Sequence, residues 1–160
     1  MQNKSDQLTT HTPSKPPKIT RLDKCLQKVS HFFQYVYYPS FHTILKPTKE
    51  HGALYLGDVA SARNITKLKR KKINTVLTIG IEMNLKYKKN DNIKHHFYPA
   101  YDSALFELNK YFGHTFVAIE NGLKNGNVLV HCVAGISRSS SIIIAYLMKK
   151  NNWSYHGKSF

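Results

Sequence analysis

The sequence is poor in cysteine and in acidic residues and has no long apolar run, and each scarcity excludes a class of protein. Its 160 residues include two cysteines, Cys25 and Cys132, which stand far apart in unlike contexts and do not suggest a disulfide framework. No apolar run is long enough to cross a membrane, and the first residues lack an apolar signal core. We therefore expect no membrane span and a reducing compartment, either the cytoplasm or the nucleus.

The scarcity of acidic residues leaves the chain strongly basic. Lys and Arg number 24 against 9 for Asp and Glu, which gives a formal charge of +15. Such a charge attracts nucleic acid, an anionic membrane or a phosphorylated substrate, and charge alone does not choose among them. Because exposed charges are screened beyond roughly 8 Å at physiological ionic strength, the charge also predicts an activity that falls with added salt.

Three regions differ in composition. Residues 1–20 are polar, with several prolines and lysines, and predict a flexible tail. Within residues 21–50, apolar side chains recur at helical spacing until Pro39, which predicts an N-terminal helix followed by a linker. Residues 51–160 carry the alternating patterns of one globular domain.

The patterns within the third region alternate between strand and helix. Strands are predicted over 53–58, 74–81, 93–98 and 128–130, and helices over 60–71, 105–123 and 139–150. This alternation predicts the α/β class, with a single domain built on a central, mostly parallel sheet that is flanked by helices.

One stretch, residues 128–141, organises the rest. Three apolar residues of a buried strand are followed by a tight loop, and then by three serines that open an apolar helix. Loop N–H groups that lead into a helix N-terminus form an anion site. Gly135 permits a backbone that turns N–H groups inward, and Arg138 offers a planar fork of donors that matches two phosphate oxygens.

Cys132 changes the prediction from binding to chemistry. A free thiol has a pKa of about 8.5, and only its thiolate is a strong nucleophile. A drop of roughly 3 units, worth ~4 kcal/mol, would leave the thiol mostly ionised at pH 7. Loop N–H groups, the helix end and the arginine could together supply that field.

The residues His131, Cys132, Arg138 and Ser139 form the pattern His-Cys-x5-Arg-Ser. This pattern resembles the signature of cysteine-dependent protein phosphatases, and Ala-Gly-Ile-Ser-Arg-Ser most resembles the dual-specificity branch. Leu-Tyr-Leu-Gly at 54–57 resembles the first sheet strand of that family. The resemblance covers about residues 53–150 and implies a protein tyrosine phosphatase-like fold. Since relatives continue with a closing helical segment, it also implies that the catalytic domain at 51–160 is incomplete at its C-terminus.

The resemblance implies a role for each residue of the loop. Cys132 would attack phosphorus to give a cysteinyl-phosphate, Ser139 would donate a hydrogen bond to the departing thiolate, and His131 would orient the loop. Phosphate oxygens would be held by Val133, Ala134, Gly135, Ile136, Ser137 and Arg138.

Asp102 is the expected general acid. It lies in a loop between a predicted strand and a predicted helix, where functional side chains are common. In the family the acid lies upstream of the cysteine and protonates the leaving oxygen, then acts as base toward water. The alternative role for Asp102 is a helix N-cap, and Asp91 in a polar turn is the poorer candidate for the acid.

The expected reaction is hydrolysis of phosphotyrosine and of phosphoserine or phosphothreonine in signalling proteins. The loop lacks the lysines that phosphoinositide phosphatases carry, so phosphoprotein is preferred over lipid. A protein kinase is a further candidate partner, while nucleic acid is not favoured. Two alternatives remain: RNA 5′-triphosphate hydrolysis, and a catalytically weak or inactive phosphoprotein-binding module. The two-step mechanism requires no metal or organic cofactor. Adjacent His95 and His96 point to opposite faces and lack a third ligand nearby, so we expect no metal site there.

Overall fold

The computed structural model describes residues 41–153. The predicted tail at 1–20, the predicted N-terminal helix and Cys25 lie outside the described residues.

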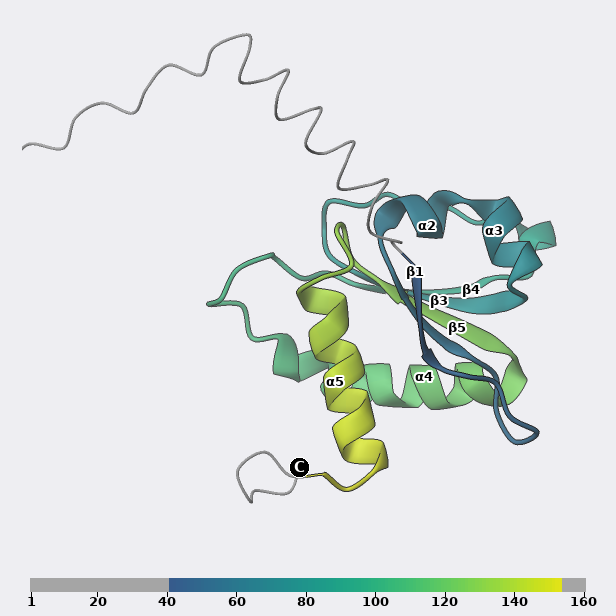
Figure 1. Cartoon of the computed structure of the whole chain (residues 1–160). Helices are drawn as coiled ribbons and strands as arrows, with labels where there is room; N and C mark the ends of the chain where they lie inside the picture. The colour runs from purple at the N-terminus through teal and green to yellow at the C-terminus, as the bar shows by residue number, and fades with distance from the viewer. Residues whose placement is uncertain (1–40, 154–160) are drawn as a thin grey trace, which may run out of the picture. The chain divides into compact units, whose positions relative to one another are not determined.

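A five-stranded sheet forms the centre of the described domain (Figure 1). Its strands are β1 (Phe41–Leu45), β2 (Leu54–Gly57), β3 (Ile73–Ile79), β4 (Lys94–Tyr98) and β5 (Asn127–His131). They lie in the order β1-β2-β5-β3-β4, and all neighbours are parallel except the edge pair β1 and β2. The prediction of a mostly parallel sheet is therefore confirmed.

Helices cover both faces of the sheet (Figure 1). The short helices α2 (Val59–Arg63) and α3 (Ile65–Arg70) pack over a cluster that includes Leu68, Val76 and Leu129. On the other face lie α4 (Phe112–Asn125) and α5 (Arg138–Lys150). Since β3 and β5 are covered on both sides, most of their side chains are apolar on both faces, as expected of central parallel strands.

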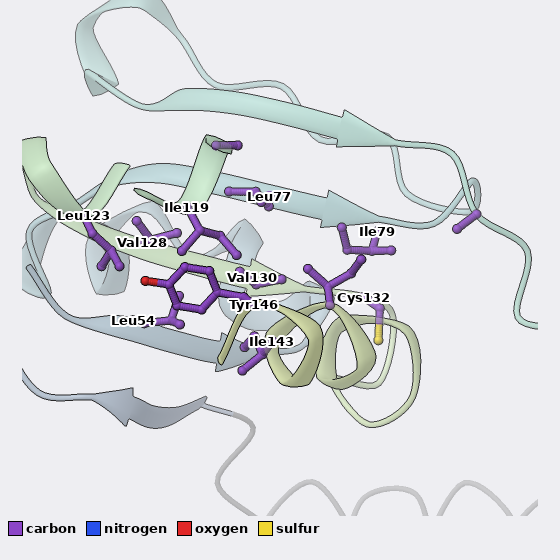
Figure 2. Close-up of a cluster of buried hydrophobic side chains, with 13 residues drawn as sticks. Leu54, Leu77, Ile79, Ile119, Leu123, Val128, Val130, Cys132, Ile143 and Tyr146 are labelled. Atoms are coloured by element: carbon purple, nitrogen blue, oxygen red, sulfur yellow. The ribbon is translucent and has the colours of Figure 1, made fainter. Parts of the chain in front are cut away.

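The larger core cluster lies between α4, α5 and the sheet, and Figure 2 shows it gathered around Tyr146. The Tyr146 ring is buried, and its hydroxyl donates a hydrogen bond to Glu120 Oε1 at 2.6 Å. Cys132 belongs to the same cluster and lies beyond the end of β5, near Ile79 at the end of β3 (Figure 2). The core thus fixes the strand ends from which the predicted anion loop departs.

Three predicted elements differ from the structure. The region 21–50 is predicted to hold only a helix and a linker, but it contains β1, a partly exposed edge strand whose residues show no apolar alternation. The helix predicted over 60–71 is divided at Asn64, whose side chain accepts the Lys67 N–H and caps α3. The helix predicted over 105–123 begins only at Phe112, after a 3-10 turn (η2) at Leu108–Tyr111.

Within residues 41–153, no helix has the length and apolar character that a membrane span requires.

Candidate active site

The loop between β5 and α5 is held against the turn that follows β2. Val59 N–H donates a hydrogen bond to Val133 O at 3.1 Å. Gly135 has φ +71°, and a Cβ at this position would lie 2.6 Å from Gly57 O. Any larger residue would therefore be both strained and in collision with backbone. This close approach explains why glycine stands at the centre of the loop.

The Cys132 thiol lies at the focus of the loop. Its Sγ accepts hydrogen bonds from Gly135 N–H and from the Ser139 hydroxyl, both at 3.2 Å. Burial raises the pKa of Cys132, but the Ser139 hydroxyl and the backbone N–H groups of Ser139, Gly135 and Ile136 outweigh it, so the pKa is lowered overall. Hydrogen bonds to the charged form stabilise a thiolate, and the thiolate is the nucleophilic form.

Arg138 is buried, with a relative exposure of 5%, and binds three groups from two other loops. Its Nη1 donates to both Glu82 oxygens at 2.9 and 2.8 Å and to Ala100 O at 3.2 Å. Its Nε is a buried donor for which the described residues offer no acceptor. A buried unpaired donor is costly, and the oxygen of a bound anion would satisfy it.

The first turn of α5 adds to this anion site. Ser137 is the N-cap residue but makes no side-chain capping bond, and the helical ladder begins with Ser141 N–H bonded to Ser137 O. The N-terminal N–H groups of the helix therefore have no capping side chain, which is the arrangement that favours an anion at a helix end.

Asp102 lies beside Arg138, where an acid could reach the leaving oxygen of a bound phosphate ester. Its Oδ2 is 3.5 Å from Arg138 Nη2, and the residue is 58% exposed. The N-cap alternative is wrong, because no helix begins at this loop and α4 starts only at Phe112. Asp91 lies elsewhere, ion-paired with Lys69 at 2.9 Å and bonded to Lys88 N–H.

His131 is fully buried and supports the loop through a chain of hydrogen bonds that crosses three strands. Its Nδ1 lies 3.1 Å from Cys132 O, and its Nε2 lies 2.7 Å from Thr78 Oγ1, which in turn lies 2.8 Å from His95 Nε2. A carbonyl only accepts, so Nδ1 donates and Nε2 accepts from the Thr78 hydroxyl. Burial is the main cause that lowers the pKa of His131 to about 4.

The structure therefore brings Cys132, Arg138, Ser139 and Asp102 together, with His131 directly behind them. Sequence reasoning missed Glu82 and Thr78, and it considered His95 only as a metal ligand and not as part of this hydrogen-bonded chain. Thr78 is a polar residue in the otherwise apolar end of β3, and Glu82 follows that strand at the same sheet edge. Thr78 carried a local signal, whereas Glu82 is placed at the site only by the rule that the carboxyl ends of parallel strands meet at one edge.

The described residues 41–153 contain no clustered metal ligands, and their large cavity lies away from the loop. No group of three or more His, Cys, Asp or Glu side chains that could hold a metal ion occurs in this range. A cavity of about 780 Å³ lies between β4 and α4 and is lined by residues such as Lys94, His96, Lys110 and Val117. Neither Cys132 nor Arg138 lines that cavity.

Comparison with known proteins gives a consistent family. The family described as dual specificity phosphatase, catalytic domain, matches residues 54–157. A probable dual specificity protein phosphatase of Dictyostelium discoideum is 42% identical over 101 residues, which are 63% of this chain and 25% of that protein. Dual specificity protein phosphatase 1B of Arabidopsis thaliana is 36% identical over 108 residues, covering 67% of this chain and 60% of the relative.

The chain thus spans from a quarter to about three fifths of the length of these two relatives. Among solved structures, DUSP15 is similar in fold, with a TM-score of 0.56 and 33% identity, covering 66% of this chain and 68% of that one.

Proposed function

Because the chain belongs to the dual specificity phosphatase family, we propose that it hydrolyses phosphomonoesters of phosphoproteins through a cysteinyl-phosphate. The proposed substrates are phosphotyrosine and phosphoserine or phosphothreonine side chains. One observation carries the proposal: a thiol with a lowered pKa lies in the loop that leads to a buried arginine, and the Nε of that arginine has no acceptor among residues 41–153. A nucleophile and an unfilled anion site are what phosphoryl transfer requires.

In the first step, the Cys132 thiolate attacks phosphorus, the S–P bond forms and the ester P–O bond breaks. The electron pair leaves with the ester oxygen, and Asp102 supplies the proton that this oxygen needs. Charge on the equatorial oxygens is stabilised by loop N–H groups and by Arg138. Since Glu82 and Ala100 fix Nη1, the guanidinium is oriented before substrate arrives.

In the second step, water attacks the phosphorus of the cysteinyl-phosphate and the S–P bond breaks. Asp102, now ionised, accepts a proton from that water, and inorganic phosphate is released. The leaving thiolate is stabilised by the Ser139 hydroxyl and the Gly135 N–H that contact Sγ. The same hydrogen bonds therefore serve the nucleophile in one step and the leaving group in the other.

The proposed partners are phosphorylated proteins, with a protein kinase as a second expected partner. The cytoplasm or the nucleus is the proposed location, and signalling is the proposed setting. These proposals rest on the family and on composition.

The test is hydrolysis of p-nitrophenyl phosphate by the whole chain beside Cys132→Ser, with circular dichroism melts of both. We expect turnover that disappears in the serine variant while the cooperative melt persists. Binding of phosphopeptide without turnover by the unchanged chain would instead establish a binding module. Release of inorganic phosphate from RNA 5′-triphosphate at a higher kcat/KM than from phosphopeptide would favour the RNA alternative.

A second comparison tests the acid. Asp102→Asn should lower kcat by about 100-fold on an alkyl phosphate, because a poor leaving group needs the proton. Asp91→Asn is the control, since its carboxylate bonds Lys69 and Lys88 and lies outside the site. A larger loss of turnover from Asp91→Asn would overturn the assignment of Asp102.

A further inference from the structure

Exposed apolar side chains gather around the mouth of the site. Nine large apolar residues are exposed among those described, and five of them lie on the three loops that meet at Arg138. These five, called here the apolar collar, are Ile81, Tyr101, Leu105, Val133 and Ile136. Soluble surfaces expose single apolar residues at random, whereas a group of them at one site indicates an interaction surface.

The three loops are brought together by Arg138 itself. The loop after β3 contributes Glu82, which contacts Nη1, and Ile81 is its neighbour in sequence. The loop after β4 contributes Ala100 O and Asp102, and Tyr101 lies between them. Figure 1 shows this loop and the N-terminal end of α5 at the same end of the sheet. The collar residues therefore lie on the loops that frame the place where a phosphate would bind, with Leu105 three positions after Asp102.

Part of the collar is held in position before any ligand binds. Tyr101 packs edge-on against Phe106, with ring centroids 5.9 Å apart, and Phe106 in turn lies 6.3 Å from Tyr111. Leu105 is 93% exposed, while its N–H donates to the Ser103 hydroxyl at 3.2 Å and fixes the local backbone. Pre-positioned groups lose less conformational entropy on binding.

The loops that border the mouth carry acidic side chains, and Arg138, the cation at the site, is buried and ion-paired with Glu82 and Asp102. The segments 80–84, 99–107 and 133–137 contain Glu82, Asp102 and Glu107 but no lysine or arginine. Nearby Lys110 has its ammonium over the Phe106 ring at 4.3 Å. Acidic residues beside the phosphorylated position would therefore meet apolar and acidic groups at the mouth, although the net charge is +15.

We infer that the collar selects phosphotyrosine flanked by apolar residues over phosphoserine or acidic flanks. This inference rests on the proposed function and names the substrate of that same site. The aromatic ring and the flanking side chains would remove collar surface from water, and Tyr101 offers an aromatic face or edge. A serine phosphate places no ring between the anion and the collar.

The test uses one peptide in matched forms: phosphotyrosine or phosphoserine, with apolar or acidic residues on either side. For the unchanged chain we expect kcat/KM to be about tenfold higher for apolar-flanked than for acidic-flanked phosphotyrosine. Leu105→Asn should lower kcat/KM for the apolar-flanked peptide by about fivefold and leave p-nitrophenyl phosphate hydrolysis unchanged. Val117→Asn, at a 56% exposed residue of α4, is the control and should change neither.

Preference for the acidic-flanked peptide, or for phosphoserine, would overturn the inference while leaving the phosphatase activity intact. So would a Leu105→Asn variant that matches the unchanged chain on every peptide. If the chain hydrolyses nothing, the proposed function fails, and fluorescence anisotropy of the same peptides with Cys132→Ser still decides the inference. Equal binding of apolar and acidic forms would then refute it.

Discussion

Replacement of Ser139 by alanine tests the electrostatics of the nucleophile most directly. The Ser139 side chain is fully buried, and its hydroxyl donates to Cys132 Sγ at 3.2 Å. A hydrogen bond to a charged group contributes about 1.5–3 kcal/mol. Because this bond favours the thiolate, Ser139→Ala should raise the pKa of Cys132 by about 1–2 units.

The rise in pKa can be read from the free protein. The rate of alkylation of Cys132 by iodoacetamide follows the thiolate fraction, so the midpoint of its pH dependence should move to higher pH in Ser139→Ala. Ser141→Ala is a matched control, since its exposed hydroxyl donates to Ser137 O in the same helix and not to sulfur. Only the Ser139 variant should move the midpoint.

The same variant should slow the second chemical step. Departure of the thiolate from phosphorus loses a donor, so phosphoenzyme should accumulate and kcat should fall more than kcat/KM. The reasoning is refuted if Ser139→Ala melts normally and yet keeps the midpoint within about 0.3 pH unit of the unchanged chain. In that case the loop N–H groups alone would set the thiol pKa.

Three further predictions concern the groups behind and beside the thiol. Thr78→Val keeps the side-chain shape but leaves His131 Nε2 without a donor. The free energy of unfolding, measured by urea titration, should fall by about 1–3 kcal/mol. No loss would mean that the hydrogen-bonded chain does not stabilise the fold. The pKa of His131 is lowered to about 4, below its unfolded value of about 6.5, so folding stability is full above pH 6.5 and declines as pH falls toward 4. The free energy of unfolding should fall by about 2 kcal/mol between pH 8 and pH 5 on account of His131, and His131→Asn should remove this contribution. An unchanged pH dependence of the free energy of unfolding in His131→Asn would contradict the burial argument. Arg138→Lys should lower kcat/KM for p-nitrophenyl phosphate by about 100-fold or more, because an ammonium cannot contact Glu82, Ala100 O and phosphate together. Near-normal turnover would show that the planar guanidinium is not needed.

The strand, loop and helix around Cys132 could be predicted because their signals are local. Three apolar residues, a glycine and a run of serines before an apolar helix are all contained within residues 128–150. The loop glycine is needed because backbone approaches it closely, and the arginine follows at the helix start. The residue types and spacing of this unit are therefore visible locally, although contacts from distant segments, such as Gly57 O against Gly135, hold it in place.

The remaining parts of the site depend on contacts that are distant in sequence. Leu105 fits a helical spacing, yet it lies in a loop and is 93% exposed, so apolar periodicity extended the predicted helix too far. Its exposure is meaningful only when the loop is placed beside Arg138. Glu82 likewise has no local pattern, and its role follows from a contact with a residue 56 positions away.

The protonation states of His131 and Cys132 are mutually consistent and decide what stabilises the thiolate. A histidinium beside the cysteine could stabilise a thiolate as an ion pair. His131 cannot play that part near neutral pH, because burial lowers its pKa to about 4 and its Nε2 accepts a hydrogen bond from Thr78. Stabilisation of the thiolate must therefore come from the Ser139 hydroxyl and the loop N–H groups that contact Sγ.

This division of roles has a measurable consequence. Above about pH 5 the charge of His131 does not change, so alkylation of the free protein should titrate as a single group, Cys132. His131→Asn should loosen the loop and alter the alkylation rate without adding or removing an ionisation above that pH. A second ionisation between pH 5 and pH 7 that disappears in His131→Asn would show that the histidine is charged in the folded protein, and that the thiol is paired with it.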